Sequence, residues 1–368
     1  MKILLIQDYL RSGGTERQSV LLANACVAAG HAVTLLTFRP GGALASTVAP
    51  GVVRYALQSF DTGLDWFAPG LNRAIERFHP DVVLCMGRMA NCYGQGIEKE
   101  VRDRWPNTAV IGTMRTGKKL PWLFRYSLRH VRHIIANSHA AKAALIADHQ
   151  LPADKITVIH NSLVFPAVTA LARNDTLRGH NSATPTTTVL LDVAMFRSEK
   201  NQRELIEAAA GLPQDFDWQL WLAGAGPSRP ACEHLAAQLG VSQRVKFLGF
   251  QADPSALYAA ADLAVHASRS ESLSNFLIEA QAHGLPAVAF AARGIDECFL
   301  PGDTGVVIAP GDHAAFRDAV LRLARPDPAR QTRARTFARA TFDPQQQVQA
   351  YLKLFAQLTG PKSVPASC

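Results

Sequence analysis

Short apolar runs of strand length recur through the first 165 residues, and each is followed by a loop and a stretch of helical periodicity. The first run, Lys2–Gln7, precedes a glycine-containing loop and a helical pattern over residues 16–29, where Thr15 and Gln18 fit a capping box. Further runs occupy residues 32–38, 81–86, 109–114, 133–138 and 156–161. Strands that alternate with helices form parallel sheets covered on both faces. This half therefore predicts a doubly wound α/β domain.

The same alternation begins again after a polar segment rich in Asn and Thr. Its apolar runs occupy residues 188–196, 218–224, 245–250, 263–268, 286–291 and 305–310. We therefore predict an N-terminal Rossmann-like domain over 1–168, a linker over 169–187, and a second Rossmann-like domain over 188–341. A helical segment and tail follow over 342–368. Two such domains predict a cleft at the carboxyl ends of both sheets.

Composition narrows the class of protein. Of 368 residues, 48% are hydrophobic and 18% are charged, which excludes wholesale disorder. The chain contains no run of 18 apolar residues, so no membrane-spanning helix is predicted. The apolar start, MKILLIQDYL, is too short for a secretory signal core. The six cysteines form no C-x-x-C pair and are expected to be buried or free thiols. These features predict a cytoplasmic protein.

Positive charge is concentrated in the first half of the chain. Residues 1–165 hold 19 Lys and Arg against 11 Asp and Glu, while the remainder holds 19 of each. Residues 104–147 contain no acidic residue, and residues 115–132 interleave basic side chains with Trp122, Phe124 and Tyr126. This segment fits contact with an anionic membrane, a nucleic-acid patch, or a solvated helix face packed by its aromatics. No nucleic-acid-binding motif accompanies it, so we expect no nucleic acid as a partner.

The stretch that is richest in candidate chemistry spans residues 268–290. Glu271 follows an apolar strand, and Glu279 lies eight residues further on, in the helix that follows. Between them, the small polar residues Ser272, Ser274 and Asn275 open that helix. Backbone N–H groups at a helix N-terminus bind anions such as a diphosphate. Upstream, Arg197 and Lys200 lie in a strand-to-helix loop and could neutralise that diphosphate.

An ordered set of six segments resembles the family-4 retaining glycosyltransferases of the GT-B fold over nearly the whole chain. The segments are SGGTER (12–17), VIHNS (158–162), FRSEKN (196–201), LAGAGP (222–227), FLGF (247–250) and ESLSNFLIEAQAHGLP (271–286). The resemblance implies two Rossmann-like domains facing a central cleft, with a final helix that crosses back to the first domain. It also implies a nucleotide-diphosphate sugar donor, such as a UDP-sugar, and a hydroxyl acceptor on a lipopolysaccharide, capsule or exopolysaccharide precursor.

The same resemblance assigns roles to individual residues. Catalysis would involve Glu271 against the donor sugar, with Arg197 and Lys200 on the diphosphate. The other donor contacts would be Gly13, Gly14, Phe250, Ser272, Leu273, Ser274, Asn275, Phe276 and Glu279, with Glu279 on the ribose and Phe250 near the base. No cofactor is expected beyond the donor as co-substrate. No metal is expected either, because the cations Arg197 and Lys200 would neutralise the diphosphate in its place.

The chain departs from the family pattern at two positions. Met195 stands where many members carry an Arg, and the first-domain segments 85–94 and 112–119 lack the family's His. Arg88, Asn91 and Arg115 in those segments are therefore candidates for acceptor contacts, and residues 115–132 for contact with an anionic membrane. Two alternatives stay open, a sugar-nucleotide epimerase and an inactive sugar-nucleotide-binding partner. A nicotinamide oxidoreductase is disfavoured because Gly224-Ala-Gly226-Pro-Ser-Arg229 lacks the third glycine of its motif.

Overall fold

The computed structural model describes residues 1–165 and 173–360. It divides into two compact units, the first formed by residues 1–162 together with the chain from residue 344 onward, the second by residues 163–343. Part of the predicted linker, residues 169–172, and the tail from residue 361 lie outside the described residues. No helix within the described ranges is long and apolar enough to cross a membrane.

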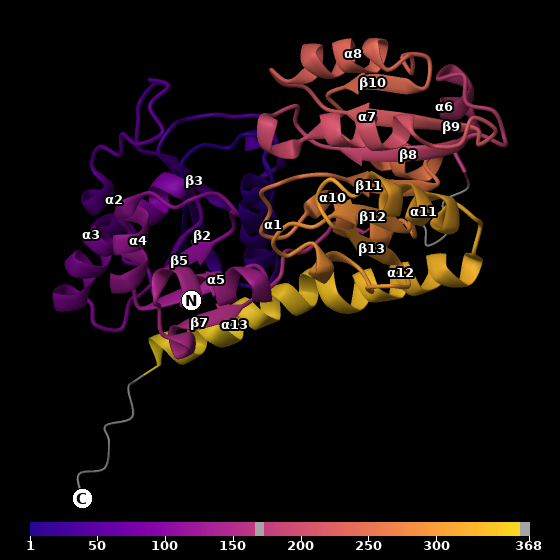
Figure 1. Ribbon diagram of the computed structural model, residues 1–368. Helices are drawn as coiled ribbons and strands as arrows, with labels where there is room; N and C mark the ends of the chain where they lie inside the picture. The colour runs from indigo at the N-terminus through magenta and orange to yellow at the C-terminus, as the bar shows by residue number, and fades with distance from the viewer. Residues whose placement is uncertain (166–172, 361–368) are drawn as a thin grey trace, which may run out of the picture. The chain divides into compact units, whose positions relative to one another are not determined.

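The first unit contains a seven-stranded parallel sheet (Figure 1). Its order is β3-β2-β1-β4-β5-β6-β7, so the direction of winding reverses between β1 and β4. The strands are β1 (Lys2–Gln7), β2 (Ala32–Thr37), β3 (Val53–Ala56), β4 (Val82–Cys85), β5 (Ala109–Met114), β6 (His133–Ala136) and β7 (Ile156–Val158). Ile6 is paired with Cys85, which places Gln7 and Asp8 next to the loop that follows β4.

Alternate residues of these strands pack against two layers of helices. Ile3 and Leu5 belong to the same apolar cluster as α1 (Gly14–Ala28) and α13 (Pro344–Thr359). Leu4 and Ile6 belong to the cluster of the opposite face. That face is covered by α2 (Leu71–Phe78), α3 (Arg88–Arg104), α4 (Trp122–His130) and α5 (His139–His149). Successive side chains of a strand point to opposite faces, so this sheet buries both of them.

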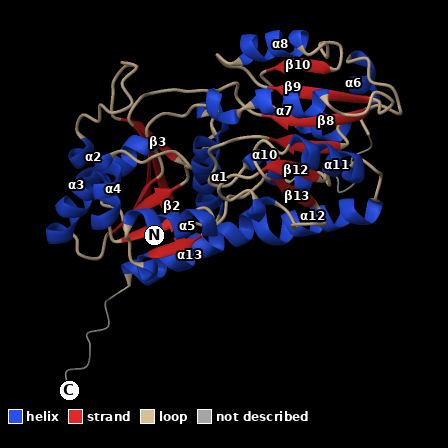
Figure 2. Ribbon diagram, in the orientation of Figure 1, coloured by secondary structure: helices blue, strands red, loops and turns tan. Residues whose placement is uncertain are grey.

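The second unit repeats this plan with six parallel strands in the order β10-β9-β8-β11-β12-β13 (Figure 2). They are β8 (Thr188–Val193), β9 (Trp218–Ala223), β10 (Val245–Gly249), β11 (Leu263–His266), β12 (Ala287–Phe290) and β13 (Gly305–Ile308). One face packs on α7 (Gln202–Ala210), α8 (Arg229–Gln238) and α11 (His313–Leu323). The other packs on α6 (Asp175–His180), α9 (Ser255–Ala260), α10 (Asn275–Ala282) and α12 (Pro328–Phe342). The predicted α/β class with two doubly wound parallel sheets is confirmed.

The linker prediction is wrong for residues 173–187. These residues belong to the second unit, and they include α6. Arg178 is fully buried there, where it forms an ion pair with Asp262 at 2.9 Å and donates hydrogen bonds to the carbonyls of Ala260 and Thr187. Polar composition indicated a linker, but the buried guanidinium satisfies backbone carbonyls of neighbouring segments and anchors the segment to the sheet.

Candidate functional site

The second sheet brings four charged side chains together near the point where its strand order reverses. Asp192 lies near the end of β8, and His266 ends the adjacent strand β11. His266 Nδ1 lies 2.9 Å from Asp192 Oδ1, and His266 Nε2 lies 3.1 Å from Glu271 Oε1. Lys200 Nζ lies 2.5 Å from the same oxygen of Glu271. We call these four residues the Glu271 network. Open α/β sheets bind their ligands at the point where the strand order reverses, which is where this network lies.

In the Glu271 network, the imidazole of His266 lies between two carboxylates. Both ring nitrogens are within hydrogen-bond distance of a carboxylate oxygen, an arrangement that favours the charged, doubly protonated ring. Burial by itself lowers the pKa of His266, but its hydrogen bonds to Asp192 and Glu271 raise that pKa above its usual value. Burial likewise raises the pKa of Glu271, but the hydrogen bond from His266 and the charge of Lys200 lower it to about 2. Glu271 is therefore ionised at neutral pH.

The loop that carries Lys200 is also joined to the Glu271 loop through the backbone. A short 3-10 turn, Ser198–Lys200, follows β8, and the carbonyl oxygen of Glu199 accepts hydrogen bonds from Arg269 N at 2.8 Å and Ser268 Oγ at 3.2 Å. The predicted approach of Lys200 to the loop that opens α10 is therefore present. Arg197 is exposed and makes no ion pair with any described carboxylate, so its contact with a diphosphate stays a prediction.

The predicted phosphate-binding turn leads into α10. Ser274 is the N-cap of this helix, and its Oγ accepts a hydrogen bond from Leu277 N. Ser272, Leu273 and Phe276 are buried, and Asn275 is half-buried. Because the turn follows Glu271 directly, the positive end of the helix dipole lies next to the Glu271 network.

The two residues predicted to contact the nucleoside occupy different settings. Tyr258 donates a hydrogen bond of 2.7 Å to Glu279 Oε2, and the Tyr258 ring stacks on His283 with centroids 4.6 Å apart. Tyr258 thus orients the carboxylate that is predicted to bind ribose. Phe250 directly follows β10, and 58% of its surface is exposed, which leaves the ring accessible to a planar base.

Two glycines after β9 allow close packing of the loops around this site. Gly224 and Gly226 both have φ of 149°, a conformation that side chains rarely adopt. A Cβ at Gly224 would lie 2.0 Å from the carbonyl oxygen of Ala194, and one at Gly226 would lie 2.3 Å from that of Phe196. Only glycine therefore lets this loop pack against the chain that leads from β8 to Arg197.

In the first unit, Gly13 and Gly14 lie at the start of α1. Gly13 is the N-cap and makes no side-chain capping bond, so the capping box predicted from Thr15 and Gln18 is wrong. Gln18 instead bonds to the backbone of Ser162 in both directions, at 2.8 and 2.9 Å. With φ of −76°, Gly13 does not need glycine for its conformation. The approach of a donor to these two residues stays a prediction.

A cavity of about 510 Å³ lies within the first unit, at the carboxyl ends of β1, β4 and β5. Its lining includes Gln7, Asp8, Arg88, Asn91, Arg115 and Lys119. All three candidate acceptor residues, from separate sequence segments, are thus brought to one cavity. Its volume lies within the range of about 300–1,000 Å³ that is usual for small-molecule sites.

Asp8 is the acid at the switch point of the first sheet. Its Oδ1 and Oδ2 accept hydrogen bonds from the backbone N–H groups of Ala90 and Met89, at 2.8 and 2.9 Å, at the N-terminus of α3. Burial raises the pKa of Asp8 to about 6, and the two backbone hydrogen bonds lower it only in part. Asp8 therefore changes its protonation state near pH 6.

The three candidate acceptor residues differ in what their polar atoms already contact. Asn91 is buried and donates to the carbonyls of Cys85 and Gly87, while its oxygen accepts from Thr113 N at 2.8 Å. Both N–H groups of its side chain are thus occupied, and Asn91 holds the ends of β4 and β5 together rather than offering donors to an acceptor. Arg115 donates to Asn161 Oδ1 and to the hydroxyl of Tyr351 in α13. Arg88 is exposed at the first position of α3.

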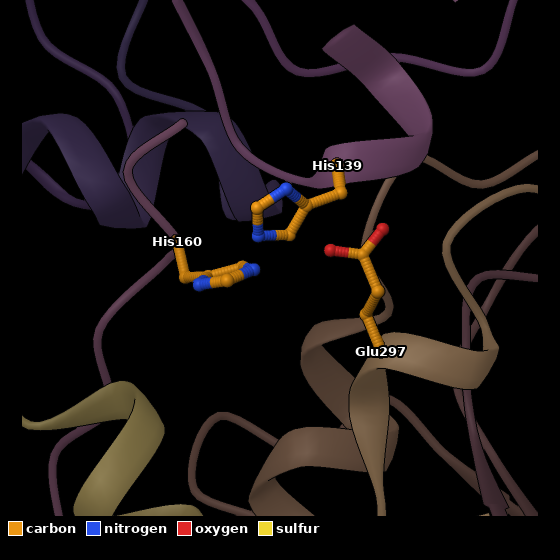
Figure 3. Close-up of side chains that lie close together, drawn as sticks. All are labelled: His139, His160 and Glu297. Carbon is orange, nitrogen blue, oxygen red and sulfur yellow. The ribbon is translucent and has the colours of Figure 1, made fainter. Parts of the chain in front are cut away.

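A histidine does follow a strand of the first sheet, but it lies outside this cavity. His139 begins α5, three residues after the end of β6, and its ring packs edge-on against His160, with centroids 5.6 Å apart (Figure 3). Glu297, the third side chain drawn there, belongs to the second unit. Neither histidine lines the cavity described above.

Sequence reasoning missed Asp8, Asp192 and His266. A signal for each was present, because each is a polar residue within or directly after an otherwise apolar strand: ILLIQD, LLDV and LAVH. An ionisable group in such a run either has a buried partner or lines a site at the strand end. Asp192 and His266 are each other's buried partner, and their separation along the chain gave no sign of this contact.

Family models match both units. Residues 12–163 match the model described as Glycosyltransferase Family 4, and residues 187–325 match the model described as Glycosyl transferases group 1. Together the two matches cover most of the described chain. The first match includes Gly13, α3 and the cavity-lining residues from Thr15 onward, and the second includes the whole Glu271 network.

Individual relatives agree with this grouping. The lipopolysaccharide core biosynthesis glycosyltransferase LpsE of Rhizobium meliloti is 36% identical over 37% of this chain and 39% of its own. LpsD of the same organism, with the same description, is 28% identical over 96% of this chain and 98% of its own. The first three relatives match over less than two-fifths of their length. The crystal structure of Anabaena HepE in complex with UDP has a TM-score of 0.79 at 22% identity, and covers 97% of this chain and all of its own.

Proposed function

Because the chain belongs to the family-4 glycosyltransferases and has the two Rossmann-like domains of the GT-B fold, we propose that it transfers a sugar from a nucleotide-diphosphate donor to a hydroxyl of a cell-envelope acceptor. The observation that carries the proposal is the Glu271 network, which places an ionised carboxylate and an ammonium group beside the N-terminus of α10. Anionic and hydroxyl-bearing parts of one donor would find complementary groups there.

In this proposal the second unit binds the donor. Lys200 uses one N–H on Glu271, and its remaining N–H groups would meet the diphosphate together with the backbone of residues 272–276. Arg197, exposed in the same loop, would add a second cation. Glu271, fixed by His266 and Lys200, would accept hydrogen bonds from donor-sugar hydroxyls, while Glu279 would accept them from the ribose. HepE, a neighbour in fold, was solved with UDP, which favours a uridine donor.

We further propose a retaining reaction. The bond between the sugar C1 and the diphosphate breaks, and the acceptor oxygen attacks the same face through an oxocarbenium-like state. The acceptor proton passes to the leaving diphosphate oxygen. Lys200, Arg197 and the α10 N-terminus stabilise the charge that develops on the diphosphate. The anomeric configuration of the product, measured by NMR coupling constants, tests this step: inversion relative to the donor would contradict it.

For the acceptor we propose a glycan or lipid-linked precursor of lipopolysaccharide, because LpsD matches nearly the full chain and is described as a lipopolysaccharide core enzyme. Two alternatives from the sequence remain as outcomes of the test. An epimerase would convert the donor sugar without an acceptor, and an inactive partner would bind donor without turnover. Radiolabelled donor incubated with extracted core acceptor separates the three by product.

Contact with an anionic membrane through residues 115–132 is part of the proposal. On α4, Phe124 and Leu128 face the core, whereas Trp122, Leu123 and Tyr126 are exposed by 66%, 43% and 45%. If the aromatics served only to pack the helix, all of them would be buried. Exposed apolar rings beside Lys119 and Arg125 suit the interface of a bilayer that carries negative headgroups, at the inner face of the cytoplasmic membrane.

Vesicle sedimentation tests this contact. We expect binding to anionic vesicles at low salt, and loss of most of it when Lys118, Lys119 and Arg125 are replaced by Gln. Replacement of Arg73, Arg77 and Lys99 by Gln removes the same charge from other exposed positions and should leave binding intact. Equal loss in both variants, or no binding by the parent protein, would refute the membrane contact.

The donor proposal is tested by a thermal-shift panel of UDP-, GDP-, ADP- and CMP-sugars, because a ligand of the folded state raises the midpoint. We expect one nucleotide class to raise it, and Glu279→Ala to weaken that ligand about tenfold while the circular dichroism spectrum stays unchanged. No shift with any donor, or full affinity in the Glu279→Ala variant, would contradict the donor site.

A further inference from the structure

The floor of the first-unit cavity presents hydrogen-bond acceptors. Gln7 is 2% exposed, and within the described residues its Oε1 has no hydrogen-bond partner. Such a buried, unpaired oxygen is uncommon and indicates a missing donor. Next to it lies the carboxylate of Asp8, whose oxygens each accept a single backbone hydrogen bond. Gly87 makes room for both, because a Cβ there would lie 2.2 Å from Asp8 Oδ1 and 2.5 Å from Gln7 Oε1.

The rest of the lining is cationic. Five basic residues line the cavity against three acidic ones: Arg11, Arg88, Arg115, Lys118 and Lys119, against Asp8, Glu16 and Asp65. Asp65 is already shared between Arg11 and Arg39. Arg115 is bound to the neutral groups of Asn161 and Tyr351, and no carboxylate in the described part of the chain forms an ion pair with it. Within the described chain, Arg88 and Lys119 form no ion pair, so the cavity carries a net positive charge.

A ligand that fits this cavity must donate hydrogen bonds to Gln7 and Asp8 and carry negative charge toward the basic residues of the lining. We propose that this cavity binds an acidic acceptor sugar, whose hydroxyl groups donate to Gln7 and Asp8 and whose phosphate or carboxylate group lies against Arg88 and Lys119. The inference rests on the proposed function, which requires an acceptor but leaves its charge open, and the candidate acceptor residues Arg88 and Arg115 line this cavity. It also accounts for the absence of acidic residues from 104 to 147, a segment that supplies Arg115 and Lys119.

Three matched probes test the proposal: glucose, glucose 6-phosphate and glucuronate, titrated at constant ionic strength with UDP present throughout. Calorimetry gives the Kd of each. We expect saturable binding of at least one acid, and at least tenfold weaker binding of glucose. The phosphate and carboxylate arms tell which oxyanion the cavity takes. Arg88→Gln and Lys119→Gln should each weaken the acid about tenfold, whereas Lys99→Gln, on an exposed position of α3, should not.

Two results would overturn the proposal. One is equal affinity for glucose and both acids, or no saturable binding of either acid. The other is a Kd for the acid that is unchanged in both Arg88→Gln and Lys119→Gln. UDP affinity, measured on the same samples, separates this from the donor proposal. Loss of UDP binding counts against the proposed function, while intact UDP binding without selectivity for acids counts against the acidic acceptor alone.

Discussion

Each sheet has a carboxylate near the point where its strand order reverses, Asp8 after β1 and Glu271 after β11, yet the two are stabilised by opposite means. In the second unit, Glu271 lies between Lys200 and the charged ring of His266, and its pKa is about 2. In the first unit, Asp8 has only the backbone N–H groups of Met89 and Ala90 as hydrogen-bond donors in the described chain, and its pKa is about 6. Both acids follow a strand that borders the point of reversal.

This difference matches different tasks. A carboxylate held by two cations keeps its charge and geometry while a diphosphate binds and leaves, which a donor site needs. A carboxylate held by dipoles alone keeps lone pairs available and can accept from the hydroxyls of an incoming sugar. The fold supplies the position, and the partners of each acid decide what the position can do.

We expect the largest effect from Asp192→Ala, which removes the most deeply buried carboxylate of the Glu271 network and should lower the free energy of unfolding. Asp192 is 1% exposed and partners the imidazolium of His266, so Asp192→Ala leaves a buried charge with one carboxylate fewer. We expect a loss of about 3 kcal/mol in the free energy of unfolding, measured by urea denaturation.

The matched control for this variant is Asp303→Ala, which removes a carboxylate that pairs with Arg333 on the surface. Exposed pairs contribute under about 1 kcal/mol. Equal losses of unfolding free energy in Asp192→Ala and Asp303→Ala would show that the Glu271 network stabilises the protein no more than an exposed ion pair does, which would contradict the comparison.

Gly87→Ala tests the role of Asp8 in the first-unit cavity. The new methyl group would overlap Asp8 Oδ1 and Gln7 Oε1, so we expect the KM for acceptor to rise about tenfold with the Kd for UDP unchanged. Gly96→Ala, also in or next to α3, meets no atom within 4 Å and should leave both constants as they are. A change in UDP affinity in Gly87→Ala would remove the separation of the two sites.

The smallest expected effect is a difference in the pH dependence of stability. Folding raises the pKa of Asp8 from 3.8 to about 6, so between those values the folded state binds a proton that the unfolded state does not. Stability of the parent protein relative to Asp8→Asn should therefore fall from pH 4 to pH 6 and then level off. The charges of Asp65 and Arg11 act on Asp8 in opposite directions and do not change this sign.

Glu271 should show the contrary behaviour. Its pKa is lowered from 4.5 to about 2, so its contribution is complete above pH 4.5 and is lost only as pH falls toward 2. Stability relative to Glu271→Gln should thus fall as the pH is lowered from 4.5 toward 3, the reverse of the trend for Asp8. A level curve for Glu271→Gln over that interval, or a level curve for Asp8→Asn between pH 4 and pH 6, would contradict the contrast.

Local periodicity predicted twelve of the thirteen described strands, because these are short apolar runs. It did not predict β3, whose residues are exposed or half-buried. Where a segment depends on distant partners, the local pattern misled. Residues 173–187 are polar enough for a linker, but Arg178 bonds to groups beyond residue 180. Gln18 fits a capping box, yet its amide bonds to Ser162, and Gln347 in α13 donates to it.

The candidate site follows the same rule. Glu271 and the turn that opens α10 are adjacent in sequence, so their proximity could be predicted from spacing. The resemblance to a family placed Lys200 on the diphosphate and Glu271 on the donor sugar, but it did not predict the direct contact between these two side chains. The roles of Asp192 and His266 could not be predicted, because a pair formed across two strands depends on strand order and register, which composition does not specify.

The most direct test of the division between the two sites uses one substitution in each unit. Lys200→Gln and Lys119→Gln remove the same charge, one from the Glu271 network and one from the first-unit cavity. Calorimetric titration with UDP should give a Kd raised about tenfold in Lys200→Gln and within about twofold of the parent value in Lys119→Gln. Equal weakening in both, or weakening in Lys119→Gln alone, would contradict the assignment of the donor diphosphate to the second unit.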